Sequence, residues 1–206
     1  VHHEPGVLVL DFLDARTFTE EDVRNVDNLP RIIDLVARVH REIGVKLTKP
    51  VLAFWPFQVN RTYVTRLKID RSAHASILPQ MLKHADMLEA ATGQVDLVVG
   101  HNDLLAANIL DDGKQLWLID WEYGGYNSPL FDLAGLASNN GLFEFQEQSM
   151  LAQYFNTTSE AYWRPYHAMK CASLMRETLW SMTSEIHSKL DFDYSAYTSE
   201  NIDRLN

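Results

Sequence analysis

Two kinds of apolar pattern alternate along the first half of the chain. The run from Val7 to Leu10 has the length of a strand and leads into a more polar segment. Residues 29–44 repeat apolar side chains at helical spacing up to a glycine, which predicts a helix. Residues 46–66 are rich in aromatic side chains and prolines and predict an irregular segment. Residues 71–92 predict a further helix, which Gly93 closes.

The second half of the chain predicts three short strands followed by helices only. The strands cover 97–99, 109–110 and 116–119, and an Asp-Gly turn between the last two is typical of a hairpin. The helices cover, in order, about 129–140, 143–155, 159–188 and 194–205. Few short strands among many helices predict an α+β fold in which helices dominate.

Composition and charge exclude several functional classes of protein. The chain has 206 residues, of which 46% are hydrophobic, and this is enough for one core. Its net charge of −10 and the absence of a basic cluster exclude a typical nucleic-acid binder. No apolar run approaches the roughly 20 residues that span a bilayer, and Cys171 is the only cysteine. We expect a cytoplasmic protein, and its acidity either attracts a cationic substrate or simply keeps it soluble.

A polar loop between two predicted strands carries the candidate chemistry. Asp103 and Asn108 lie in the sequence His-Asn-Asp-Leu-Leu-Ala-Ala-Asn, and the predicted hairpin returns the chain to Asp120. Phosphoryl transfer from a nucleotide needs Mg²⁺ on oxygen ligands and a carboxylate near the attacking hydroxyl. His-x-Asp-x₄-Asn is also the spacing of kinase catalytic loops. We therefore predict ATP and Mg²⁺ as cofactors, Asp103 as the catalytic base, and Asn108 and Asp120 as metal ligands. The alternative is a surface loop whose polar side chains cap turns.

Two neighbouring side chains have other predicted roles. His101 is expected to brace the loop backbone rather than to do chemistry. Glu122 is either an additional metal ligand or a solvated carboxylate, and the sequence favours neither.

The sequence around these residues resembles the choline/ethanolamine kinase family, within the aminoglycoside-phosphotransferase-like small-molecule kinases. The resemblance is carried by residues 99–110, by Ile-Asp-Trp-Glu-Tyr-Gly-Gly-Tyr-Asn at 119–127 and by Phe-Asp-Leu-Ala at 131–134. It extends over the whole chain and implies a protein-kinase-like fold. Residues 1–14 would be the last small-lobe strand and the hinge, and residues 15–206 the mostly helical C-terminal catalytic lobe.

The resemblance also assigns roles outside the catalytic loop. The backbone of Asp11, Phe12 and Leu13 would meet the adenine of ATP. Asp132 would hydrogen-bond the catalytic loop in a structural role. Because the chain contains no glycine-rich loop or strand lysine before the hinge, we expect the rest of the small lobe to lie outside it. Residues 1–206 alone are then expected to transfer phosphate poorly.

The short interval between Asp120 and Asp132 leaves no room for a regulated activation loop and favours a small substrate. Cationic groups bind over aromatic faces. The aromatic content fits a quaternary ammonium substrate, and the candidates to hold that group are Tyr123, Trp180 and Tyr197. Ordinary packing is the preferred interpretation of any one of them alone, but the resemblance implies substrate binding for Tyr123 and Trp180. The helix after Asp132 lacks the carboxylate that eukaryotic choline kinases carry there, which weakens the case for choline itself.

These observations predict an ATP-dependent phosphotransferase acting on a small amino alcohol, with choline, ethanolamine and thiamine left open. An aminoglycoside or other antibiotic phosphotransferase is a second hypothesis, and a non-catalytic pseudokinase a third. The intact Asp103, Asn108 and Asp120 argue against the pseudokinase. The sequence is compatible with a homodimer and does not fix the oligomeric state.

Overall fold

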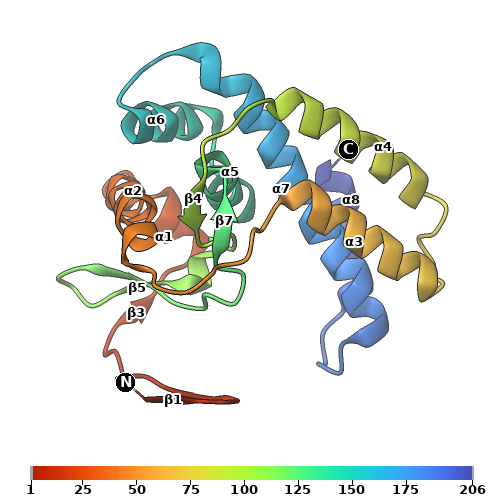
Figure 1. Ribbon diagram of the computed structural model, residues 1–206, viewed down its shortest axis with the longest axis horizontal. Coiled ribbons are helices and arrows are strands. Elements are labelled where there is room, and N and C mark those ends of the chain that lie inside the picture. The colour runs from red at the N-terminus through yellow and green to blue at the C-terminus, as the bar shows by residue number, and fades with distance from the viewer. Residues whose placement is uncertain (1, 206) are drawn as a thin grey trace.

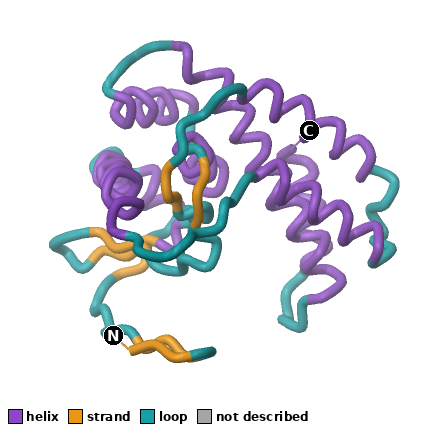
Figure 2. Tube along the Cα trace, viewed as in Figure 1, coloured by secondary structure: helices purple, strands orange, loops and turns teal. Residues whose placement is uncertain are grey.

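A computed structural model describes residues 2–205 and confirms an α+β fold in which helices dominate (Figures 1 and 2). Seven short strands form three small antiparallel sheets within these residues. The strands are β1 (His2–Glu4), β2 (Val7–Val9), β3 (Arg16–Thr17), β4 (Val98–Gly100), β5 (Ile109–Asp111), β6 (Leu116–Leu118) and β7 (Gly125–Asn127). The helices are α1 (Glu20–Arg24), α2 (Asn28–Lys46), α3 (Pro56–Ile69), α4 (Leu78–Thr92), α5 (Pro129–Asn140), α6 (Glu144–Phe155), α7 (Trp163–His187) and α8 (Tyr194–Leu205), with short 3₁₀ turns at Ala106–Asn108 and Glu160–Tyr162.

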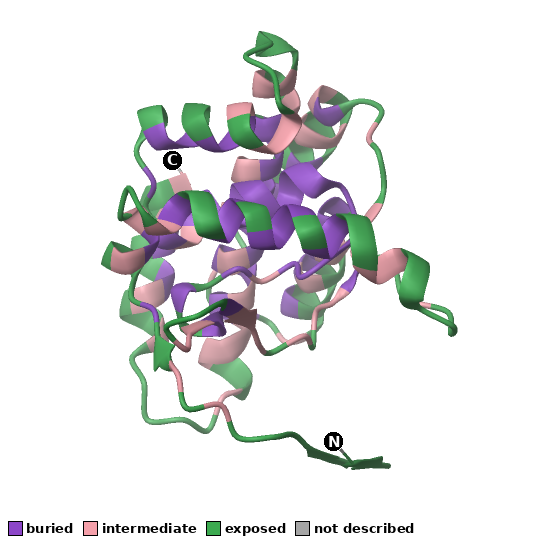
Figure 3. Ribbon diagram, turned by 90° about the vertical axis from the view of Figure 1, so that its left-hand side faces the viewer, coloured by how far each residue is buried: buried purple, intermediate pink, exposed green. Residues whose placement is uncertain are grey.

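The N-terminal strand forms as expected, but as the second arm of a hairpin. β1 pairs with β2 and projects away from the rest of the chain, and Figure 3 shows the hairpin exposed throughout. Leu8 and Phe12 are 65% and 91% exposed. After an extended stretch, β3 pairs with β5 and ties this segment to the middle of the chain. The assignment of residues 1–14 to a small lobe and hinge stays a prediction.

Two helices hold the middle of the molecule together. α5 is buried along almost its entire length, with Leu133 and Leu136 fully enclosed. α7 packs against α3, α4, α5 and α8. Figure 1 shows it running between α5 on one side and α3, α4 and α8 on the other. Each enclosed leucine contributes roughly 1.5–3 kcal/mol relative to an exposed one. The sheet of β4 and β7 lies beside α2 and α5, so the loop after β4 rests on this core.

The prediction for residues 46–92 was wrong in two places. Residues 56–69 form helix α3 rather than an irregular segment, with Pro56 in its first turn. Its buried stripe is interrupted by Asn60, whose side-chain amide donates to the Ala172 carbonyl at 3.2 Å, so the apolar period is hard to read. The following helix begins only at Leu78, because residues 70–77 form turns in which Arg71 has a positive φ of 55°.

Other predicted elements are confirmed with small shifts. The Asp-Gly hairpin forms between β5 and β6, with Ile109 opposite Leu118 and Gly113 at φ 81°. The last long helix, α7, is continuous because Pro165 lies in its first turn, where a proline costs no hydrogen bond. Strands β1, β3 and β7 and the short helix α1 were not anticipated.

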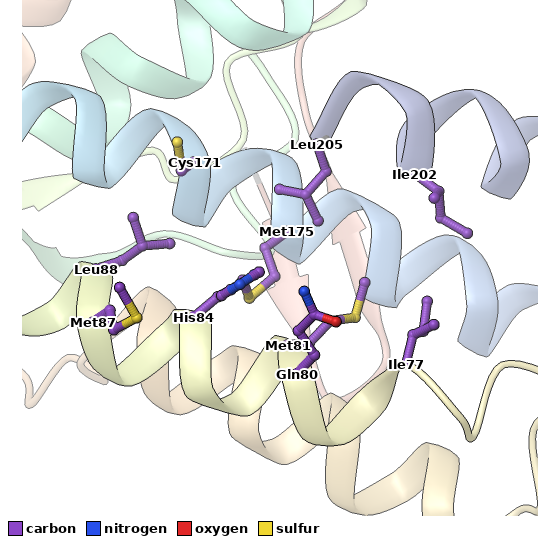
Figure 4. A pocket seen from close by; sticks show the side chains of 10 residues that line it. All are labelled: Ile77, Gln80, Met81, His84, Met87, Leu88, Cys171, Met175, Ile202 and Leu205. Carbon is purple, nitrogen blue, oxygen red and sulfur yellow. The ribbon is translucent and has the colours of Figure 1, made fainter.

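A groove separates α4 from α7 and α8 (Figure 4). It encloses about 330 Å³ and is lined mainly by apolar side chains, among them Met81, Met175 and Leu205, and also by Cys171 and His84. None of the predicted site residues lines it. Within residues 2–205, no helix combines the length and the apolar character that crossing a bilayer requires.

Candidate active site

The loop after β4 is anchored by one buried carboxylate. Asp132, in the first turn of α5, accepts hydrogen bonds from the backbone N–H of His101 at 2.7 Å and of Asn102 at 2.6 Å. His40 on α2 contacts the same carboxylate at 2.9 Å through Nε2, and its Nδ1 lies 2.7 Å from the Tyr154 hydroxyl. Burial alone raises the pKa of a carboxyl, but these donors hold the pKa of Asp132 below its usual range. These contacts support the structural role expected for Asp132, which stays a prediction.

Asn102 joins this loop to β7, and the sequence reading did not single it out. Its backbone adopts a left-handed conformation at φ 66°, which asparagine tolerates better than most residues. Its side-chain amide donates to the Tyr123 carbonyl at 2.9 Å and the Gly125 carbonyl at 3.2 Å. Asn127 donates in turn to the Asn102 side-chain oxygen at 3.0 Å. The backbone just before Asp103 is therefore hydrogen-bonded to α5 through Asp132 and to β7 through the Asn102 side chain.

Hydrogen bonds connect the loop that carries Asp103 and Asn108 to the end of the hairpin, just before Asp120. The Asn108 side-chain amide donates to the backbone carbonyl of Asp103 at 3.0 Å, which leaves the Asn108 side-chain oxygen for another partner. The Ile119 N–H donates to the Asn108 carbonyl at 3.1 Å and so brings Asp120 next to Asn108. Asp120 is exposed and adopts a left-handed conformation at φ 60°, and Glu122 is also exposed.

This donor set suits Mg²⁺ better than a metal that needs a full protein cage. Among residues 2–205, no three Asp, Glu, His or Cys side chains gather closely enough to hold a metal by themselves. Mg²⁺ usually keeps several waters and is bound by one or two protein oxygens together with substrate phosphates. Asn108 and Asp120 offer two such oxygens, with Glu122 two residues further along the chain.

His101 is fully buried beneath the loop. Its Nε2 lies 2.8 Å from the Ile119 carbonyl, and its ring packs against Trp121 with centroids 4.7 Å apart. These contacts connect the loop to the end of β6 and keep the imidazole away from solvent. They support the bracing role of His101, which stays a prediction.

The side chain of Asp103 faces an arginine that the sequence reading missed. Arg176 on α7 is 5% exposed and its Nη1 lies 3.0 Å from Asp103 Oδ1 and 3.2 Å from Glu177 Oε2. The same guanidinium lies over the Tyr123 ring, with Cζ 4.6 Å from the centroid. Burial lowers the pKa of Arg176, but the charges of Asp103 and Glu177 outweigh it, so the pKa rises overall.

The aromatic residues predicted to bind substrate gather around the same part of α7. Tyr197 on α8 donates its hydroxyl to Glu177 Oε1 at 2.7 Å. Trp180, one turn further along α7, packs edge-on against Tyr194 at 6.0 Å. Burial, followed by the neighbouring Tyr63 phenol, raises the pKa of Tyr123 to about 12, so Tyr123 stays neutral at physiological pH.

The predicted adenine contacts lie on the extended stretch between β2 and β3. Asp11 and Phe12 are exposed and Leu13 is half-buried. β3 connects this stretch to β5, the strand that follows Asn108. The adenine-binding role of these three residues stays a prediction.

Comparison with known proteins identifies the family of this chain. A family model described as choline/ethanolamine kinase matches residues 4–161, which is more than half of the chain. The chain belongs to the choline/ethanolamine kinase family. Protein LicA of Haemophilus influenzae is 27% identical over 206 residues, covering 96% of this chain and 75% of LicA.

Solved structures confirm the protein-kinase-like fold of this family member. A choline/ethanolamine kinase family protein from Mesorhizobium loti matches with a TM-score of 0.85 at 23% identity, covering 100% of this chain and 71% of that one. A macrolide 2'-phosphotransferase type I matches less well, with a TM-score of 0.57 at 17% identity over 98% of this chain and 64% of its own. The chain thus spans about three quarters or less of each of these proteins.

One signal in the sequence could have revealed Arg176. Along α7, the buried positions Ala172 and Leu179 define an apolar stripe, and Arg176 lies in that stripe four residues after one and three before the other. A charged side chain on the buried face of a helix needs a partner of opposite charge. That reasoning predicts a buried ion pair, although it does not identify Asp103 as the partner.

Proposed function

We propose that the full-length protein transfers the γ-phosphate of ATP to the hydroxyl of a small amino alcohol. One observation supports the proposal most: in a chain of the choline/ethanolamine kinase family, hydrogen bonds join Asn108 to Asp103 and connect Ile119, the residue before Asp120, to Asn108. A carboxylate base beside two oxygen ligands is the arrangement that phosphoryl transfer requires.

In the proposed reaction, Asp103 orients the substrate hydroxyl and receives its proton as the oxygen attacks the γ-phosphorus. The bond between that phosphorus and the β–γ bridging oxygen breaks, so ADP leaves and a phosphomonoester forms. Mg²⁺, when bound, would neutralise charge on the phosphate oxygens. Asn108 and Asp120 would hold it, and the backbone at Asp11 to Leu13 would position the adenine.

The anionic side chains near Asp103 support a cationic substrate. Asp103 and Glu177 flank a single guanidinium, and Glu122 adds a further carboxylate two residues after Asp120. Because carboxylates outnumber cationic groups here, a protonated amine is attracted to the same region as its own hydroxyl.

The Asp103→Asn variant of the full-length protein tests this proposal. General-base catalysis is worth about 10²–10⁴-fold, so we expect kcat to fall by that factor while ATP binding is retained. Coupled detection of ADP with ethanolamine, choline, thiamine and an aminoglycoside identifies the acceptor. Asp203→Asn, at an exposed carboxylate on α8, is the matched control and is expected to keep normal turnover. A near-normal kcat in Asp103→Asn contradicts the catalytic role.

A further inference from the structure

The chain places a cation of its own where the substrate's ammonium group was expected. Arg176 is buried, pairs with both Asp103 and Glu177, and lies over the face of Tyr123. Carboxylates and an aromatic face are the two kinds of group that bind an amine cation. In this site both already have a permanent cationic partner.

Tyr123 is therefore a poor partner for a quaternary ammonium group on this face. A trimethylammonium group has no N–H donors and depends on aromatic faces, each contact being worth roughly 0.5–2 kcal/mol. The guanidinium of Arg176, 4.6 Å from the ring centroid, occupies that position. A bulky cation would have to displace an arginine whose side chain is 6% exposed and which pairs with two carboxylates.

The same contacts suit an ammonium group that can donate hydrogen bonds. Asp103, Arg176 and Glu177 together carry one net negative charge, which a single protonated amine neutralises. An ionised carboxylate has about four acceptor positions. Glu177 uses one oxygen for Tyr197 and the other for Arg176, and so retains acceptor capacity.

The spacing of the two carboxylates also fits a short substrate. Asp103 Oδ1 and Glu177 Oε2 each lie about 3 Å from the same nitrogen of Arg176, so they are within roughly 6 Å of each other. In a two-carbon amino alcohol, standard bond lengths place the hydroxyl oxygen and the nitrogen about 3–4 Å apart. Such a molecule can present its hydroxyl to Asp103 and its ammonium group to Glu177 at the same time.

We propose that Arg176 makes this site selective for alcohols that carry a protonated primary amine over those that carry a quaternary ammonium group. The inference rests on the proposed function and specifies its substrate class. Arg176 acts by covering the Tyr123 face and by fixing the separation of Asp103 and Glu177. Glu177 then receives the N–H donors that only the less methylated amine offers.

The first test uses the unaltered full-length protein with ATP and ethanolamine, N-methylethanolamine, N,N-dimethylethanolamine and choline. We expect kcat/KM to fall at each added methyl group, because each one removes an N–H donor, with choline at least tenfold below ethanolamine. A flat series, or one that rises toward choline, overturns the proposal. If none of the four is phosphorylated, the proposed function fails together with it.

The second test assigns the selectivity to the arginine. Arg176→Met keeps the apolar stem of the side chain but removes the guanidinium from the Tyr123 face, so the ethanolamine-to-choline ratio of kcat/KM should fall about tenfold. If the loss of Arg176 only shifts the Asp103 side chain, kcat falls for both alcohols and the effect cancels in this ratio. Arg164→Met, at an exposed arginine on the same helix, should leave the ratio unchanged. A thermal melt confirms folding, and an unaltered ratio in folded Arg176→Met refutes the role of Arg176 while leaving the proposed function intact.

Discussion

Replacing Asp132 by asparagine should destabilise the protein by about 3–5 kcal/mol, because it breaks a buried charged network. The carboxylate accepts three hydrogen bonds, from Asn102 N–H at 2.6 Å, His101 N–H at 2.7 Å and His40 Nε2 at 2.9 Å. Hydrogen bonds to a charged group are worth roughly 1.5–3 kcal/mol each. An asparagine retains one acceptor oxygen and turns an N–H₂ group toward the donors on the other side. Since a domain of this kind has only about 5–15 kcal/mol of stability, the loss is large.

The pH dependence of the unfolding free energy shows whether Asp132→Asn acts by removing the charge or by changing the packing. The pKa of Asp132 is held below its usual value in the folded state, so its contribution is complete above the unfolded pKa of about 3.9. It is lost as the pH falls through the lower, folded pKa. Urea unfolding followed by circular dichroism should therefore show a full difference between the two proteins at pH 5–7, and a shrinking one below about pH 4. Asp203→Asn is the exposed control. A difference under about 1 kcal/mol at pH 7, or one that stays constant down to pH 3, refutes this account.

Two further substitutions probe the metal site and the backbone beside it. Asp120→Ala should abolish the Mg²⁺ dependence of nucleotide binding in a fluorescence titration, because it removes the only carboxylate among the two principal ligands, and an unchanged titration contradicts its role. Gly125→Ala should destabilise the fold by about 1–3 kcal/mol in urea, because the added methyl would lie 2.6 Å from the Leu52 carbonyl oxygen. Gly44→Ala is its control: the new methyl meets Val99 at an ordinary 3.6 Å in a helix, so stability should be kept or slightly increased, and equal effects of the two substitutions would count against the steric argument.

The geometry around Asp103, Asn108 and Asp120, which we propose to be catalytic, could be predicted because its determinants are local in sequence. The Asp-Gly turn fixes the β5–β6 hairpin, and the hairpin alone brings Asp120 back beside Asn108. Asp132 follows shortly afterwards at the start of α5. These residues fall within one stretch, so turn chemistry and motif spacing suffice to place them together.

The contacts around α7, where we propose that substrate binds, could not be predicted in the same way. Arg176 meets Asp103 across 73 positions of sequence, and Tyr197 meets Glu177 only because α8 folds back along α7. Helical periodicity marks Arg176 as buried but does not say which loop lies opposite. Helix α3 was missed for a related reason, since its stability comes from packing on α7, and Asn60 obscures its apolar stripe.

The separation of these two parts of the proposed site has a consequence for how substrate preference can change. The backbone carbonyl of Asp103 accepts hydrogen bonds from the Asn108 side chain at 3.0 Å and the Leu105 N–H at 2.9 Å, neither of which belongs to α7. The hydrogen bond between Asp103 and α7 is made by the Asp103 carboxylate, which accepts from Arg176. A substitution at Arg176 therefore frees one side-chain rotamer of Asp103 while its backbone stays in place. Because Asp132 and Asn102 hold the loop independently of α7, we expect substitutions on α7 to change which amine the proposed site accepts at a modest cost in the rate of transfer.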